Sequence, residues 1–195
     1  MQYSNFVIVH RYVMDSIIFI VLLHLLTGAV SAVVAAPLND DAAKRQHAYE
    51  LYADYRKHFP EVEEIESRAA IDFLEAKDVV FLDVRKTEEQ QVSMIPGAIT
   101  KETFMDNLER YRGKRIIAYC TISYRSGKLA AKLERKGISV VNLKAGLLGW
   151  VHAGGPLVRQ QQPVQQLHVY GRKWDLAPAG IETIFFKWYQ MVIAD

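Results

Sequence analysis

The sequence predicts an α/β fold with a mostly parallel central sheet, and three observations support this. Apolar runs at 79–82 and 116–119 are typical of strands that are covered on both faces, as in a parallel sheet. Helix-like segments separate these runs and a third predicted strand at 138–143, with short connections. The 195 residues are 50% hydrophobic, which suffices for one ordinary domain with a core plus appendages.

An apolar leader precedes the predicted domain. Residues 17–26 are strongly apolar, and residues 27–36 continue in smaller side chains. This order is typical of a secretory signal cleaved within 31–36, and the same run is about long enough to span a bilayer. We therefore expect residues 1–36 to be a signal peptide or membrane anchor, and the protein to be exported or membrane-anchored and extracytoplasmic. The alternatives are a cytoplasmic protein in which this run is a core helix, and a true start at Met14.

The elements of the domain follow the leader in a regular alternation. In chain order we expect a helix at 42–60 ended by Pro60, an edge strand at 62–65, a helix at 68–76, a strand at 79–82, one or two helical turns at 87–92, a short strand after the turn at 95–99, a helix at 102–111, a strand at 115–119, a helix at 126–136 and a strand at 138–143. In such a fold the ligand site lies beyond the carboxyl ends of the strands. Asp83 and Cys120 both follow strands there.

The pattern stops after the predicted domain, which we bound at 62–158. Residues 159–166 are rich in glutamine and read as a linker. Residues 178–194 show helical spacing of apolar side chains, so we expect 159–195 to be a linker and a C-terminal extension with a helix. That helix is expected to pack on the domain, with docking on a partner or a membrane surface as the alternative.

Composition narrows the function class. A net charge of +2 and a pI near 8.6 are too mild to indicate a nucleic-acid partner. The single cysteine excludes an intramolecular disulfide and a cysteine-based zinc site, and the six histidines show no metal-ligand spacing. No glycine-rich phosphate motif is present. We therefore expect no metal and no cofactor.

Cys120 is the strongest candidate for a catalytic residue. It follows an apolar strand and precedes a polar loop that opens a helix. Backbone N–H groups converge at such a place and the helix dipole adds positive potential, so a thiol there should react as a thiolate. We expect the substrate to be an anion bound by the loop and by the Arg125 guanidinium, through Thr121, Ile122, Ser123, Tyr124, Arg125 and Ser126. The alternative is a buried structural cysteine.

Four segments between about residues 62 and 158 carry a resemblance to a known family. In order they are Phe81-Leu82-Asp83-Val84-Arg85 with Glu89, similar to D-V-R-x-x-x-E; Ile95-Pro96-Gly97-Ala98-Ile99, similar to I-P-G-A; Tyr119-Cys120-Thr121-Ile122-Ser123-Tyr124-Arg125-Ser126, similar to C-x-x-G-x-R-S; and Leu143-Lys144-Ala145-Gly146-Leu147-Leu148-Gly149-Trp150, similar to L-x-G-G-x-x-x-W. Together they resemble a single rhodanese domain. The resemblance implies a three-layer α/β/α domain.

The chain departs from the family pattern at three places, which together comprise four residues. Ser93-Met94 stands where Gly-His is usual, Ser123 replaces the loop glycine, and Ala145 replaces the first glycine of the last segment. A residue other than glycine narrows the allowed backbone, so the departure at 123 bears on substrate preference more than on fold.

The resemblance implies a sulfurtransferase that works through a persulfide on Cys120. The partners would be a small anionic sulfur donor such as thiosulfate or a persulfide, and a thiol, a protein or cyanide as acceptor. It also implies that Asp83, Arg85 and Glu89 are structural support, with Arg85 paired to Glu89 and Asp83 tying down the loops near the cysteine.

Two other readings stay open at this point. A non-catalytic rhodanese-like binding or sensing module is one, although such modules usually lose the cysteine that this chain keeps. A cysteine-dependent phosphatase of the related cell-cycle type is the other. Those phosphatases have five residues between cysteine and arginine, whereas four separate Cys120 from Arg125.

Overall fold

The computed structural model describes residues 40–185. The predicted leader at 1–36 and residues 186–195 lie outside this range, so export or membrane attachment stays a prediction. Among residues 40–185, no helix has both the length and the apolar character needed to cross a bilayer.

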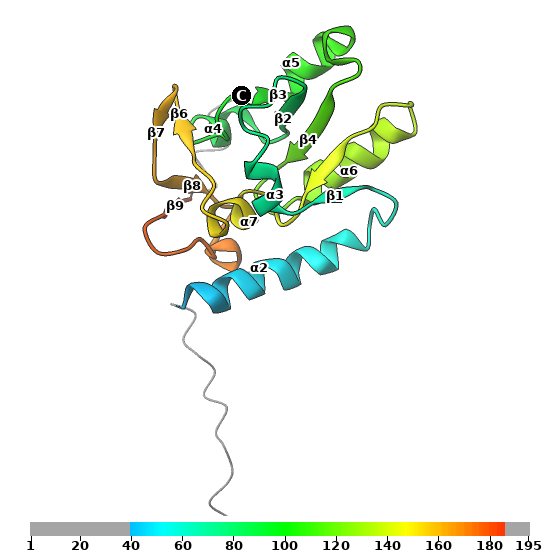
Figure 1. The fold of residues 1–195 in the computed structure, drawn as a ribbon. Coiled ribbons are helices and arrows are strands. Elements are labelled where there is room, and N and C mark those ends of the chain that lie inside the picture. The colour runs from blue at the N-terminus through cyan, green and yellow to red at the C-terminus, as the bar shows by residue number, and fades with distance from the viewer. Residues whose placement is uncertain (1–39, 186–195) are drawn as a thin grey trace, which may run out of the picture. The chain divides into compact units, whose positions relative to one another are not determined.

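A five-stranded parallel sheet forms the centre of the fold (Figure 1), in the order β1-β5-β4-β2-β3. Its strands are β1 (Glu64–Ile65), β2 (Val79–Asp83), β3 (Ile99–Thr100), β4 (Arg115–Tyr119) and β5 (Val141–Leu143). All the pairings are parallel, which confirms the predicted sheet, and β1 is an edge strand as predicted. Asp83 pairs with Tyr119, so the ends of β2 and β4 lie side by side and bring Asp83 close to Cys120 in the sheet.

The central strands are buried because they are apolar on both faces. In β4, Ile117, Ala118 and Tyr119 are fully buried. Neighbouring β2 contributes Leu82 and Phe81 to the same core, and Phe81 meets the buried Trp150 edge to face, with ring centroids 5.6 Å apart. Such packing needs cover on both sides of the sheet.

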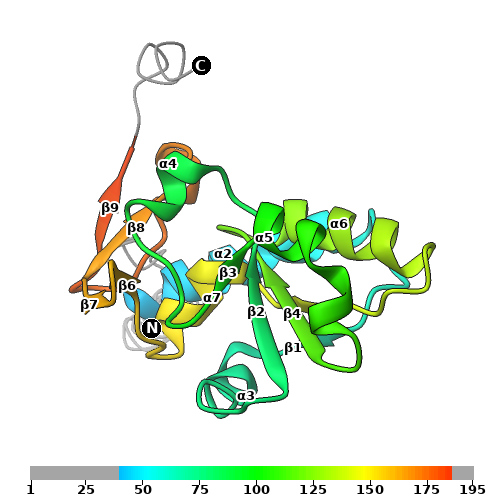
Figure 2. The same cartoon turned by 90° about the horizontal axis from the view of Figure 1, so that it is seen from above.

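Helices supply that cover and give the domain three layers. They are α2 (Asp41–Arg56), α3 (Ser67–Ile71), α4 (Thr87–Gln90), α5 (Lys101–Asp106), α6 (Tyr124–Glu134) and α7 (Gly146–His152), with 3-10 turns η1 (Leu108–Tyr111) and η2 (Arg172–Trp174). Figure 2 shows α3 on one side of the strands and α5 and α6 on the other. α6 contacts β4 and β5, and α5 contacts β2 and β3.

The predicted N-terminal helix is present as α2 and is anchored to the sheet. Asp40 caps it by accepting a hydrogen bond from the Ala42 N–H at 3.0 Å. Its buried Tyr52 donates its hydroxyl hydrogen to the Glu64 carboxylate of β1 and accepts from Asn142 Nδ2 of β5 at 3.1 Å. α2 also packs against α6 and α7, so it belongs to the domain.

The segment predicted as a linker is instead folded. A β-hairpin joins β6 (Val158–Arg159) to β7 (Gln162–Pro163). After it, β8 (Gln166–His168) pairs in parallel with β9 (Glu182–Ile184). We call residues 158–185 the C-terminal extension. The glutamines that suggest a linker are mostly exposed.

The predicted C-terminal helix at 178–194 is wrong over residues 178–185. Gly180 has a left-handed φ of +88°, which interrupts a helix, and the β-branched Thr183 and Ile184 pair with β8 instead. The remainder of the predicted helix, 186–194, lies outside the described residues.

The C-terminal extension is part of the core. Its buried apolar residues are Leu167, Val169, Leu176 and Ala177. Three contacts fasten it to the domain: His152 Nε2 donates to the Leu176 carbonyl at 2.7 Å, Lys44 Nζ donates to the Ala177 carbonyl at 3.1 Å, and Met94 and Val158 exchange backbone hydrogen bonds at 2.8 and 2.9 Å.

The hairpin loop offers a test of this structure. Gln160 and Gln161 are the two loop residues, with φ of +51° and +66°. A two-residue loop with positive φ at both positions favours Asn-Gly, and a residue with a Cβ there costs about 1 kcal/mol or more. The double substitution Gln160→Asn/Gln161→Gly should therefore raise the free energy of unfolding by about 1 kcal/mol in chemical denaturation. Valine at both positions should lower the free energy of unfolding. If the Asn/Gly and the Val/Val double substitutions changed this free energy in the same direction, the left-handed loop would be contradicted.

Candidate active site around Cys120

Cys120 lines a cavity at the end of β4. The cavity has a volume of about 430 Å³ and is lined by Tyr55, Cys120, Thr121, Ile122, Tyr124, Arg125, Tyr170 and Trp174. The thiol is free, and the residue is only 2% exposed. Cys120 is therefore buried, as a structural cysteine would be, but a small molecule that enters the cavity can reach it.

The loop after Cys120 is held through its carbonyl groups. The N–H groups of Leu147 and Leu148, at the start of α7, donate to the carbonyls of Cys120 and Thr121 at 2.9 and 3.1 Å. Within residues 40–185, none of the backbone N–H groups from Thr121 to Ser126 donates to a protein acceptor. These N–H groups lie at and before the first turn of α6, so they remain available to an anion.

Ser123, which stands where the family pattern has a glycine, adopts a backbone conformation that favours glycine. Its φ and ψ are 63° and 15°, in the left-handed region, which costs a residue with a Cβ about 1–2 kcal/mol. Two buried contacts hold Ser123 in this conformation. The Ser123 hydroxyl donates to the Leu143 carbonyl, and Asn142 Nδ2 donates to the Ser123 carbonyl at 3.2 Å. Ala145, the other replacement of a glycine, is also left-handed, with a φ of 55°. Two of the departures from the family pattern, Ser123 and Ala145, thus lie in the left-handed region that glycine adopts at lower cost.

Arg125 lies at the cavity with its charge already paired. Its two terminal nitrogens donate to the two Glu89 oxygens at 2.7 and 2.8 Å, and its guanidinium lies 4.9 Å from the centre of the Tyr170 ring. Burial works to lower the pKa of Arg125, but the Glu89 hydrogen bonds and the negative charge that Cys120 can carry outweigh it, so the pKa is raised. Arg125 is therefore a permanent cation that Glu89 orients.

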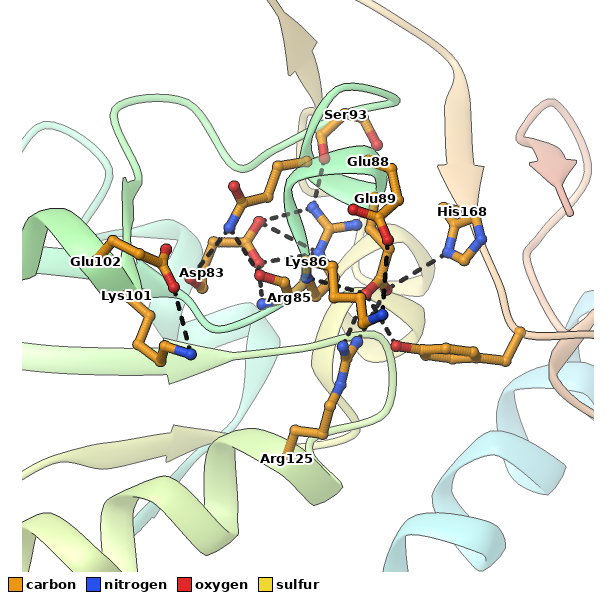
Figure 3. Close-up of polar contacts among 12 residues, drawn as sticks. Asp83, Arg85, Lys86, Glu88, Glu89, Ser93, Lys101, Glu102, Arg125 and His168 are labelled. Atoms are coloured by element: carbon orange, nitrogen blue, oxygen red, sulfur yellow. Dashed lines mark hydrogen bonds and ion pairs between the residues drawn. The ribbon is translucent and has the colours of Figure 1, made fainter. Parts of the chain in front are cut away.

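Glu89 joins three parts of the chain. Besides Arg125, its carboxylate accepts from the Tyr170 hydroxyl at 2.9 Å and from the Lys86 N–H at 3.0 Å, and His168 Nδ1 lies 3.4 Å away (Figure 3). Burial works to raise the pKa of Glu89, but the hydrogen bonds from His168 and Arg125 outweigh it and hold the pKa well below the ordinary range. The carboxylate is thus ionised although its side chain is 2% exposed.

The predicted pairing of Arg85 with Glu89 is wrong. Arg85 instead donates to Asp83, from Nε at 3.0 Å and from Nη2 at 2.7 Å, and it also donates to the Ser93 carbonyl. Burial works to lower the pKa of Arg85, but the Asp83 carboxylate outweighs it and raises the pKa. The reason is geometric: α4 begins at Thr87, so Arg85 does not share a helical face with Glu89.

The structure brings most of the predicted substrate-binding residues to the cavity. Thr121, Ile122, Tyr124 and Arg125 line it with Cys120, whereas Ser123 and Ser126 are fully buried in the loop. The sequence analysis missed the contributions of Tyr55, Tyr170 and Trp174. No group of three or more His, Cys, Asp or Glu side chains that could hold a metal ion occurs in the part of the chain that the structure describes.

Gly146 gives a test of how the Cys120 loop is supported. A Cβ at Gly146 would lie 2.3 Å from the Cys120 carbonyl oxygen, whereas a Cβ at Gly154 would meet nothing within 4 Å, and both residues have left-handed φ. Gly146→Ala should therefore cost about 1–3 kcal/mol more unfolding free energy than Gly154→Ala, and it should change the alkylation rate of Cys120. Equal effects of the two variants on both measurements would show that α7 does not support the loop.

Glu89 should make the stability depend on pH. Because its folded-state pKa is depressed, its contribution is fully present above its unfolded pKa of about 4.3 and is lost as the pH falls toward the folded value. Glu89→Gln should cost about 3–5 kcal/mol at pH 7, and the difference from the unaltered protein should shrink below about pH 4. Glu109→Gln, which breaks an exposed ion pair with Arg112, should change little at either pH. A difference for Glu89→Gln that does not vary with pH would contradict the ionised carboxylate.

The segment that contains Cys120 is similar to known proteins. Residues 67–153 match the family model of the rhodanese-like domain. A tRNA uridine(34) hydroxylase of Buchnera aphidicola is 33% identical over 98 residues, which cover 45% of this chain and 31% of that protein. A sulfurtransferase of Allochromatium vinosum is 29% identical over 102 residues, which cover 50% of this chain and 95% of that protein. The solved thiosulfate sulfurtransferase of Pseudomonas aeruginosa is 21% identical, with a TM-score of 0.46, over 60% of this chain and 24% of that one. The chain thus spans less than a third of the hydroxylase and nearly all of the sulfurtransferase, and residues 67–153 belong to the rhodanese-like domain family.

Proposed function

We propose that the protein is a sulfurtransferase that moves sulfane sulfur from thiosulfate or a persulfide to a thiol or to cyanide through a persulfide on Cys120. The observation that carries this proposal is the position of the one cysteine of the chain. Cys120 lines a cavity at the carboxyl end of a parallel strand, next to a fixed cation and next to loop N–H groups that have no protein acceptor within residues 40–185. These features suit a thiolate that attacks an anionic donor.

In the first half-reaction, the Cys120 thiolate attacks the outer sulfur of the donor. A sulfur–sulfur bond forms between the cysteine and that atom, and the donor's own sulfur–sulfur bond breaks. With thiosulfate, sulfite leaves with the bonding electron pair. No proton moves, so no general base is needed while the cysteine is ionised.

In the second half-reaction, the acceptor attacks the outer sulfur of the persulfide. The bond to Cys120 breaks, its electron pair returns to the cysteine as thiolate, and the acceptor leaves as thiocyanate or as a new persulfide. The loop N–H groups from Thr121 to Ser126 would stabilise the negative charge in both steps. Arg125 would add a fixed positive charge, with Glu89 as its positioning residue.

The two other readings from the sequence compete with this proposal. In a binding or sensing module, Cys120 would acquire no sulfur from a donor. In a phosphatase, the same loop would cleave phosphate esters; the four residues between Cys120 and Arg125 make a tighter loop, which suits a sulfur-centred substrate better. A phosphate-ester assay would distinguish a phosphatase from a sulfurtransferase.

The name of one relative suggests a third activity, hydroxylation of a tRNA uridine. Its support is the 33% identity to the Buchnera protein, but only 31% of that protein aligns with this chain. Incubation of uridine-containing tRNA with the protein, followed by nucleoside analysis, would test this activity. Export or membrane attachment through residues 1–36 is a separate proposal that rests on the sequence alone.

Cys120→Ser tests the central proposal. The substitution keeps the size of the side chain but removes the nucleophile, so thiocyanate formation from thiosulfate and cyanide should fall by at least about 10³-fold while the thermal unfolding midpoint stays nearly unchanged. Mass spectrometry of the unaltered protein after thiosulfate treatment should show one added sulfur atom on Cys120. A protein that gains no sulfur from any donor would favour the binding module, and a variant with full activity would end the proposal.

A further inference from the structure

Tyr170 of the C-terminal extension contacts both members of the Arg125–Glu89 pair. Its hydroxyl donates to Glu89 Oε2 at 2.9 Å, the same oxygen that accepts from Arg125 Nη1 at 2.7 Å. The Arg125 guanidinium lies over its ring, 4.9 Å from the ring centre. A cation at this distance from an aromatic ring is attracted to it. Tyr170 therefore meets the pair at two points, through its hydroxyl and through its ring.

Arg125 has few other contacts that fix its position. It lies in the first turn of α6, and its side chain is 30% exposed. In the part of the chain that the structure describes, its guanidinium donates to no acceptor other than Glu89. A long side chain has many rotamers, and a single partner at its tip leaves it free to tilt out of the plane of the carboxylate. A ring against the face of the guanidinium opposes that movement.

Neighbouring residues hold Tyr170 in place. It follows β8 and Val169, which is fully buried and donates its N–H to the Ile184 carbonyl at 3.0 Å. On either side of Tyr170 in the chain lies an aromatic ring that meets it edge to face. The ring centroid of His168 is 5.6 Å away and that of Trp174 is 6.1 Å away. The C-terminal extension therefore presents Tyr170 to Arg125 from a fixed backbone.

The protonation state of Tyr170 makes it a donor to the pair. Burial raises the pKa of Tyr170, and although the charge of Arg125 works to lower it, Glu89 raises it further, so the hydroxyl keeps its proton. A neutral phenol that donates to a carboxylate makes a charge-assisted hydrogen bond. Tyr170 and Arg125 both line the cavity with Cys120. The contacts that fix the guanidinium therefore also set the positive potential at the thiol.

From these contacts we infer that Tyr170 is a positioning residue, which together with Glu89 fixes the Arg125 guanidinium at the Cys120 cavity. The inference deepens the proposed function and rests on it, because there Arg125 supplies a fixed positive charge to an anionic donor. Tyr170 lies outside residues 67–153, which match the rhodanese-like domain. The C-terminal extension thus adds to the site a side chain from a segment that the family model does not cover.

The test measures the potential at Cys120 without sulfur transfer. Iodoacetate and iodoacetamide alkylate a thiolate by the same displacement, in which a carbon–sulfur bond forms and iodide leaves, but only iodoacetate is negatively charged. The ratio of the two rate constants at low ionic strength, iodoacetate over iodoacetamide, therefore reports the positive charge beside the thiol, and the fraction of thiolate cancels.

Two substitutions of Tyr170 separate its ring from its hydroxyl. Tyr170→Leu removes both and should lower the alkylation ratio by about fivefold, whereas Tyr170→Phe keeps the ring and should lower it by about twofold. Because Tyr170 is 44% exposed, both variants should keep the thermal unfolding midpoint nearly unchanged. Thr183→Val is the matched control: its hydroxyl donates to Asp175 at 2.7 Å within the same extension, and its loss should leave the ratio unchanged.

A double-variant background tests whether Tyr170 acts through Arg125. In Glu89→Gln/Arg125→Gln neither charge is left without its partner, and the guanidinium is gone. Adding Tyr170→Leu to this background should change the ratio by less than about twofold, because the residue that Tyr170 positions is absent. A fivefold drop in this background as well would overturn the inference, since Tyr170 would then act on Cys120 by another route.

Sulfur transfer separates failure of this inference from failure of the proposed function. With cyanide as acceptor, Tyr170→Leu should raise the KM for thiosulfate by about fivefold and change kcat by less than about twofold. If the unaltered protein transfers no sulfur, the proposed function fails, and a lowered alkylation ratio in Tyr170→Leu still upholds the placement of Arg125. If transfer occurs and Tyr170→Leu leaves the alkylation ratio unchanged, the inference is overturned and the proposed function stands.

Discussion

The site depends on one buried carboxylate. Glu89 lies on α4, accepts from Arg125 of the cysteine loop, and accepts from Tyr170 of the C-terminal extension, with His168 beside it. A carboxylate taken out of water is costly unless several donors surround it, and here the donors come from the cysteine loop and from the C-terminal extension. The same contacts therefore satisfy the charge, orient Arg125 at the cavity and hold the extension over Cys120. Glu89 is thus a polar anchor that these three segments share.

Local pattern was sufficient to predict the sheet and the position of Cys120 at the end of a strand. The apolar runs that became β2 and β4 are buried on both faces, which is a property of the residues themselves. The placement of Cys120 follows from the end of β4 and the start of α6, both visible in the sequence. Ser123 was harder to interpret, because its left-handed backbone depends on contacts with Asn142 and Leu143, which only the fold brings near.

The C-terminal extension was not predictable for a related reason. Its buried residues, Leu167, Val169, Leu176 and Ala177, show no helical or alternating period over enough positions to mark an element. β9 forms because Thr183 and its neighbours pair with β8, which lies some way back along the chain, and helical spacing in that segment gave the wrong element. The partner of Arg85 was missed because a spacing of four residues indicates contact only within a helix, and Arg85 precedes α4. As a result, the positions of Tyr55, Tyr170 and Trp174 at the Cys120 cavity could not be predicted from local pattern.

The low exposure of Cys120 has a consequence for the lifetime of the intermediate. A persulfide formed there would extend into a cavity that protein side chains partly surround, and not onto the open surface. On the proposed chemistry, only a molecule slender enough to enter could collect the sulfur; a folded protein would have to present its thiol on a thin, protruding tail. Such confinement would limit transfer of the persulfide sulfur to thiols that only collide with the protein surface.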